Sequence, residues 1–184
     1  TQQNRHPMTH ILAITIGPIF DTLQQARKTR ELWAASYLYS HLTGLLMAEL
    51  EKIGGKIILP RPIEDGSKTR YGAGIYNDRL FADIGGGDLS KVDTAIQKAI
   101  DRLAADVTVE GADTDQDFWQ KFLRVKWTHK TIESLTDGAL FKQMDPLLNA
   151  AELHRPYFCD APEKDRLTEL LGEVYETRLA KSAL

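Results

Sequence analysis

The stretch from Ile11 to Tyr39 constrains the fold of this chain more than any other. Its first six residues, ILAITI, are apolar or β-branched, and a Gly17-Pro18 turn follows them. A long run without Gly or Pro comes next, with apolar side chains at the three- and four-residue spacing of a helix. This order predicts a buried strand, a sharp turn and an amphipathic helix that packs back on the strand.

The rest of the chain extends this pattern. Both faces of the first strand are apolar, which is typical of a central strand covered on both sides. Further strands are predicted at 56–59, 79–84 and 122–130. Helices are predicted from Asp21 or Thr22 to Ile53, and at 89–107, 117–122, 138–155 and 163–183. Gly54-Gly55 is expected to end the first helix.

The order of elements over residues 9–130 is therefore β-α-β-β-α-β, the ferredoxin-like order. We predict an α+β protein in which residues 9–132 form a ferredoxin-like domain and residues 133–184 a helical extension. Residues 1–8 are expected to be a disordered N-terminus or a remnant of cloning.

Composition narrows the classes of function. The 184 residues are 42% hydrophobic and 27% charged, with a net charge of -3. This is enough apolar content for a core, and the slight acidity gives no global attraction to nucleic acid. The one cysteine, Cys159, excludes a disulfide framework and a cysteine-based zinc site. No apolar run is long enough for a membrane span and no signal peptide is evident, so we expect a cytoplasmic protein without a membrane partner.

A family resemblance lies in the segment from Ile16 to Ser40, which reads IGPIFDTLQQARKTRELWAASYLYS. It resembles a signature near the start of the large subunit of type III-B (Cmr) CRISPR effector complexes. There, a strand ending in S-I-G-P-V-Q leads into a helix reading roughly A-R-R-T-R-D-L-W-A-G-S-Y-L-L-S. Phe20 stands where the family usually has Gln, and Ala35 where it usually has Gly. The segments NDRLFADI and LLNAAELHRPYF are fainter echoes of the same family.

The resemblance implies that residues 9–132 are the first palm-like domain of such a subunit, the non-catalytic one. In the family this domain faces a catalytic palm domain, with ATP between them, and the subunit makes cyclic oligoadenylate in antiviral defence. The implied cofactors are ATP and Mg²⁺ or Mn²⁺ in the full-length subunit. The implied partners are the other CRISPR effector subunits, guide RNA, target RNA and the catalytic palm domain. The family's large subunits are several times longer, so we expect a fragment or a reduced member.

The family's two catalytic motifs are missing from the sequence. None of the five histidines is followed by Asp, so an HD nuclease is excluded. A palm cyclase holds two metal ions with carboxylates from its first strand and from a GGDD hairpin between the second and third strands. Here the first strand has no acid, and GGDD does not occur. We therefore predict no catalytic residue in this chain.

The sequence GGGD at 85–88 is the nearest approach to a metal motif. We interpret it as a tight turn in which Asp88 caps the next helix. One alternative is that the Gly-rich turn binds phosphate through its free backbone N–H groups. The other is a metal site made by Asp21, Asp83 and Asp88.

A nucleotide site is predicted around the Gly-Pro turn and the basic cluster after it. Its residues are Gly17, Pro18, Arg27, Lys28 and Arg30. Arginine suits phosphate because its planar guanidinium group binds two oxygens at once. The same cluster also fits a solvated helix face or an interdomain ion pair.

An RNA or subunit contact is predicted in the irregular connection 61–77, which is long for a compact domain. Its residues are Arg61, Lys68, Arg70 and Tyr71, and the alternative is a plain surface loop. Trp127 and His129 are a further candidate, as a base-stacking platform. Two other functions stay open: a stand-alone nucleotidyl-cyclase-like enzyme, and a small RNA-binding ferredoxin-like module.

Overall fold

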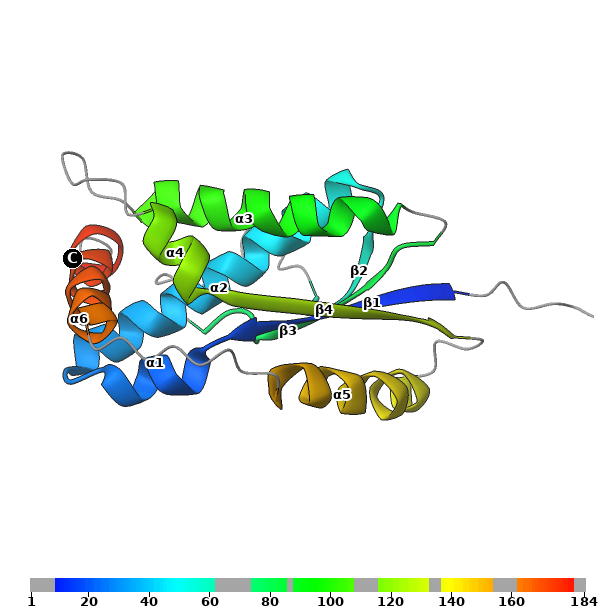
Figure 1. Cartoon of the computed structure of the whole chain (residues 1–184), viewed down its shortest axis with the longest axis horizontal. Helices are drawn as coiled ribbons and strands as arrows, with labels where there is room; N and C mark the ends of the chain where they lie inside the picture. The colour runs from blue at the N-terminus through cyan, green and yellow to red at the C-terminus, as the bar shows by residue number, and fades with distance from the viewer. Residues whose placement is uncertain are drawn as a thin grey trace, which may run out of the picture.

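The computed structural model describes most of the chain as a sheet with helices on both faces (Figure 1). The described residues are 9–61, 74–85, 88–107, 116–132, 137–153 and 162–180. The strands are β1 (Thr9–Gly17), β2 (Lys56–Leu59), β3 (Arg79–Asp83) and β4 (Arg124–Ile132). The helices are α1 (Ile19–Gln25), α2 (Thr29–Lys52), α3 (Val92–Val107), α4 (Gln116–Phe122), α5 (Asp137–Leu153) and α6 (Pro162–Val174). A 3-10 turn (Leu89–Lys91) precedes α3, and a π turn (Tyr175–Leu179) follows α6.

The sheet has the order β2-β3-β1-β4, and every neighbouring pair is antiparallel. β1 therefore lies in the interior, next to the strands that come third and fourth in the chain. This is the split β-α-β arrangement of a ferredoxin-like fold. The predicted fold class, α+β with a ferredoxin-like sheet followed by helices, is confirmed.

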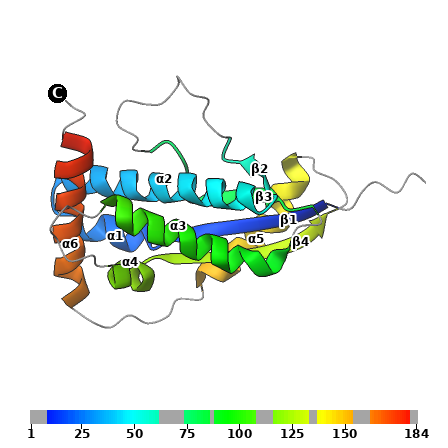
Figure 2. The same cartoon turned by 90° about the horizontal axis from the view of Figure 1, so that it is seen from above.

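Two apolar layers cover the sheet. On one face, Leu12, Ile14 and Ile16 of β1 join the main core under α2 and α3. On the other face, Ile11 and Ala13 pack with residues of α5, as Figures 1 and 2 show for the helix positions. The prediction of a central strand covered on both sides is thus confirmed. It follows that α5 occupies the sheet face opposite α2 and α3.

The last helix stands apart from the sheet. α6 crosses one end of the molecule beside α1 and the beginning of α2 (Figure 2). Its buried side chains, Leu167, Leu170, Leu171 and Val174, belong to the main core. Among the described helices, none is both long enough and apolar enough to cross a bilayer.

One helix prediction was wrong. The single helix expected from Asp21 or Thr22 to Ile53 is two helices, because the chain leaves helical geometry between Gln25 and Thr29. The buried carboxylate of Glu31 accepts hydrogen bonds from the backbone N–H groups of Arg27 (2.6 Å) and Lys28 (3.0 Å). A glutamate at the third helical position satisfies amides that the start of a helix leaves without partners.

The predicted end of that helix is confirmed. α2 stops at Lys52, and Gly54 follows with a φ of 91°. Only glycine adopts such a left-handed conformation without a steric cost, which makes it the common residue after a helix end.

Candidate functional site

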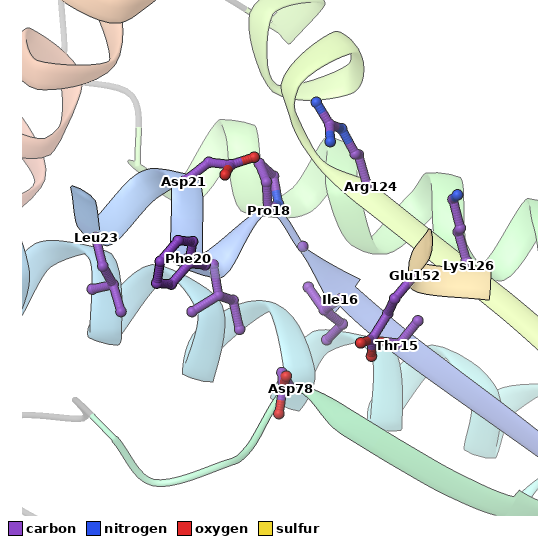
Figure 3. Close-up of a pocket in the computed structure, with 12 residues that line it drawn as sticks. Thr15, Ile16, Pro18, Phe20, Asp21, Leu23, Asp78, Arg124, Lys126 and Glu152 are labelled. Carbon is purple, nitrogen blue, oxygen red and sulfur yellow. The ribbon is translucent and has the colours of Figure 1, made fainter. Parts of the chain in front are cut away.

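A cavity of about 330 Å³ lies at the carboxyl end of β1 (Figure 3). We call it the strand-end pocket. It is lined by Thr15, Ile16, Gly17, Pro18, Ile19, Phe20, Asp21, Leu23, Asp78, Arg124, Lys126 and Glu152. β1, its following turn, α1, the residue before β3, β4 and α5 all contribute, so segments far apart in the sequence meet here.

The Gly17-Pro18 turn forms one wall of this pocket. Proline has no N–H and cannot continue the strand ladder, so β1 ends here and the chain enters α1. The hydroxyl groups of Tyr39 on α2 (2.8 Å) and Thr22 on α1 both donate to the carbonyl oxygen of Pro18. Burial raises the pKa of Tyr39, so its phenol stays a hydrogen-bond donor. The turn is therefore anchored to α2 from inside the core.

The carboxyl end of α5 forms a second wall. Glu152 Oε1 accepts a hydrogen bond from the Thr15 hydroxyl (2.7 Å) and from the Arg79 guanidinium group (3.1 Å). Arg79 also binds Asp145 of α5 (3.1 Å). The Lys126 ammonium group donates to the carbonyl oxygen of Ala151 (2.9 Å). These polar contacts fix α5 against β1, β3 and β4 at the pocket.

The remaining walls differ in chemistry. Arg124 and Lys126 line the side formed by β4, where they stand opposite Gly17 and Thr15. Phe20 and Leu23 project from α1 at the other side, as Figure 3 shows. They are 64% and 39% exposed. The pocket thus combines two basic side chains on β4 and an apolar, aromatic side on α1 with the carboxylates of Asp21, Asp78 and Glu152.

The structure divides the predicted nucleotide residues between two places. Gly17 and Pro18 line the strand-end pocket. The basic cluster lines a separate open groove of about 820 Å³ against α6, which we call the α6 groove. It is lined by Arg27, Lys28, Arg30, Glu31, Thr168, Glu169, Gly172, Glu173, Glu176 and Thr177. Arg30 forms an ion pair with Glu176 there (3.2 Å), so it has an acidic partner within the chain.

The structure does not bring the three predicted metal ligands together. Asp83 pairs with Ile11 at the amino-terminal end of β1, whereas Asp21 follows the opposite end of that strand. A strand rises about 3.3 Å per residue, which places roughly 20 Å between Ile11 and Gly17. Nor does any cluster of three Asp, Glu, His or Cys side chains in the described part of the chain suit a metal ion.

Two of these acids have structural roles. Asp83 accepts a hydrogen bond from the Gly85 amide (2.7 Å). Asp88 accepts one from the Ser90 amide (3.0 Å), as the predicted helix cap requires. The hydrogen bonds from Ser90 lower the pKa of Asp88, and nearby Lys91 adds to this effect.

The predicted RNA or subunit contact falls largely outside the described residues, since Lys68, Arg70 and Tyr71 lie beyond them. Arg61 is described and exposed, and it lines a shallow surface pocket with Tyr76 and Phe141.

The predicted stacking platform does not lie on an open sheet face. Trp127 packs against the main core on the side of α2 and α3, and its indole N–H donates to Asp93 (2.7 Å). The opposite face carries α5. RNA-recognition domains stack bases on aromatic side chains of an uncovered sheet, and the described sheet offers no such face.

Sequence reasoning missed the distant members of the strand-end pocket. Arg124 and Lys126 did carry a signal, because alternate basic residues on a strand share one face. Glu152 carried none, since it lies 137 positions from its partner Thr15.

A comparison with protein families bears on the same region. Residues 11–79 match the family model described as CRISPR-associated protein Cmr2, N-terminal. The match includes β1, the Gly-Pro turn, α1, α2 and β2, and ends at the first residue of β3. No curated protein matches the chain. The family match supports an assignment of this segment to the N-terminal region of a Cmr2-type large subunit, in agreement with the resemblance of Ile16 to Ser40.

Proposed function

We propose that this chain is the non-catalytic palm-like domain of a type III-B CRISPR effector large subunit. In this proposal it acts in the cytoplasm, in antiviral defence, within a complex that contains the other effector subunits, guide RNA and target RNA. The strand-end pocket forms one side of an ATP site that is completed by a catalytic palm domain. Pairing of target RNA with the guide licenses that palm to make cyclic oligoadenylate.

The observation that carries the proposal is the position of the strand-end pocket. Palm enzymes place their reactive groups at the carboxyl end of the first strand, beside the hairpin that leads into the third. The pocket lies at this end of the sheet, and Asp78, the residue immediately before β3, is part of its lining. Its Gly17-Pro18 wall belongs to the segment matched by the Cmr2 family model.

Two basic side chains of the pocket also support a nucleotide. Arg124 and Lys126 line one small cavity, which the carboxylates of Asp21, Asp78 and Glu152 also line. Glu152 is already bound by Thr15 and Arg79. Basic side chains neutralise phosphate, and arginine can bind two phosphate oxygens at once. The volume falls at the lower end of the range for small-molecule sites, as expected if a second domain supplies the rest.

The described residues do not fit the divalent metal that palm chemistry uses. The part of β1 at the pocket is Thr15-Ile16-Gly17, without a carboxylate, and no suitable cluster of ligands is present among the described side chains. In our proposal the catalytic palm domain therefore holds Mg²⁺ or Mn²⁺, and this chain contributes binding and orientation of the nucleotide.

The test measures oligoadenylate synthesis by mass spectrometry, with ATP and Mg²⁺ or Mn²⁺. The purified chain alone should give no product, whereas the effector complex that contains it should give product once target RNA is added. Arg124→Ala in this chain should lower the yield from the complex at least tenfold, an expected cost of about 1.4 kcal/mol. Lys130→Ala is the matched control, because Lys130 is an exposed basic residue of the same strand that lies outside the pocket.

Two results would contradict the proposal. Product from the chain alone, lost in Asp83→Ala or Asp88→Ala, would make it a stand-alone cyclase. Equal yields from Arg124→Ala and Lys130→Ala would remove the strand-end pocket from the ATP site.

A further inference from the structure

The strand-end pocket has an aromatic side to which the proposed function gives no role. Phe20 and Leu23 are separated by three positions on α1, and both line the cavity. Residues three apart on a helix share a face. Phe20 is nevertheless 64% exposed. A ligand that covered this ring would be stabilised by the burial of its apolar surface.

The basic side chains of the same pocket lie on β4. Arg124 pairs with Gly17 and Lys126 with Thr15, and positions two apart on a strand project from the same face. Figure 3 shows Phe20 and Leu23 on the α1 side and Arg124 and Lys126 along β4, with Ile16 and Pro18 between them. An aromatic surface and two cationic side chains therefore line one cavity, together with the carboxylates of Asp21, Asp78 and Glu152.

We infer that the pocket orients its nucleotide, with the base stacked on Phe20 beside Leu23 and the phosphates toward Arg124 and Lys126. This inference rests on the proposed function and assigns a direction to the ligand within that site. A nucleotide has the same division, with a flat aromatic base at one end and anionic phosphates at the other. Stacking of a base on an aromatic side chain contributes about as much as one good polar contact.

The geometry favours a nucleotide over a protein segment as the occupant of this side. A protein that covered Phe20 and Leu23 would need mainly apolar surface, yet Asp21, Asp78 and Arg124 line the same cavity. Their charges would be costly to bury without polar partners. A nucleotide offers phosphate as a partner for Arg124, and hydroxyl and amino groups as hydrogen-bond donors to Asp21 and Asp78.

The experiment is saturation-transfer NMR on the full chain, with ATP and with inorganic triphosphate as ligands at millimolar concentration. This method detects weak binding and reports which ligand protons touch the protein. The base protons of ATP should receive the most saturation, and ³¹P line broadening should report phosphate binding for both ligands.

Variants at Phe20 separate the two ends of the ligand. Phe20→Leu keeps an apolar side chain but removes the ring, and it should weaken ATP binding about tenfold and leave triphosphate binding unchanged. Phe20→Trp should retain the base signals. Phe141→Leu is the control, because Phe141 is a partly exposed phenylalanine on α5 that does not line this pocket.

The outcomes distinguish this inference from the proposed function. If Arg124→Ala weakens phosphate binding while Phe20→Leu leaves the base signals intact, the stacking assignment is wrong and the nucleotide site stands. If neither substitution changes any ligand signal, or if no ligand signal appears, both proposals fail.

Discussion

The strand-end pocket and the α6 groove both contain basic side chains, but their surroundings differ. In the α6 groove, the cluster at Arg27 to Arg30 faces Glu169 and Glu173 of α6 and Glu176 of the π turn that follows it. In the strand-end pocket, Arg124 and Lys126 share the cavity with the exposed side chains of Phe20 and Leu23. The acids Asp21, Asp78 and Glu152 line it as well, so the apolar, aromatic side is what distinguishes this pocket from the α6 groove. A basic run in the sequence is thus a poor guide to an anion site, because its acidic partners can come from a distant helix.

The resemblance to a family leads to the same distinction. The basic cluster between α1 and the first turn of α2 belongs to the matched segment, as does the Gly-Pro turn. Of the two, only the turn lines the strand-end pocket. The first prediction therefore concerns structure. Substitutions in the segment between α1 and α2, which joins the strand-end pocket to the α6 groove, should affect the two regions differently.

Replacing Glu31 is expected to have the largest effect, since this residue separates α1 from α2. Glu31→Ala removes a buried acceptor from two backbone N–H groups and should lower the free energy of unfolding by about 2–3 kcal/mol. Chemical denaturation measures this loss. Glu51→Ala, at an exposed position of the same helix, should change stability by less than about 0.5 kcal/mol. A loss in Glu31→Ala no larger than in this control would mean that Glu31 does not hold the break between the two helices.

Tyr39→Phe should act on the strand-end pocket from inside the core. The change removes one of two hydroxyl donors to the Pro18 carbonyl oxygen and should cost about 1 kcal/mol. Amide hydrogen exchange should rise in α1 and leave α6 unaffected. The control is Tyr37→Phe on the same helix, where the ring stacks on His41 instead of meeting the turn. Faster exchange in α6 would show that the two regions are coupled through α2.

Glu152→Gln should loosen the α5 wall of the strand-end pocket. The amide keeps an acceptor for Thr15 but loses the charge that faces Arg79, at a partly exposed site, so the cost should be well under 1 kcal/mol. Hydrogen exchange at the end of α5 is the sensitive measurement. Glu169→Gln, an exposed acid of the α6 groove, is the control. Unchanged exchange at residues 148–153 would contradict the role given to Glu152.

The Arg30–Glu176 ion pair should give the smallest effect. Its side chains are 41% and 60% exposed, and exposed pairs contribute about 0–1 kcal/mol. A double-mutant cycle with Arg30→Ala and Glu176→Ala should yield a coupling in this range that shrinks with salt, while ligand signals at Phe20 stay unchanged. If Arg30→Ala abolished nucleotide binding, the α6 groove and not the strand-end pocket would be the nucleotide site.

The sequence predicted the sheet well because the apolar pattern of β1 indicates burial on both of its faces. Five apolar side chains on alternating faces require cover on both sides, and the structure supplies it with α2 and α3 on one face and α5 on the other. The break before Thr29 was missed because an unbroken helical period conceals it, and only the backbone contacts of Glu31 reveal it.

The candidate site was predicted in part. Gly17 and Pro18 mark the end of a strand in any reading of the sequence, so their place was predictable. Asp78, Arg124 and Glu152 reach the pocket through strand pairing and the docking of α5, which depend on contacts distant in sequence. Asp21, considered only as an alternative metal ligand with Asp83 and Asp88, lines this pocket.

The position of α5 limits which parts of the sheet another molecule can contact. With α2 and α3 on one face of the sheet and α5 on the other, both faces of the described strands are covered by helices. A neighbour can then reach them along the outer edges of β2 and β4 or at the strand ends. Any partner that contacts the strands themselves therefore does so at this rim of the sheet, and the strand-end pocket is a hollow in it.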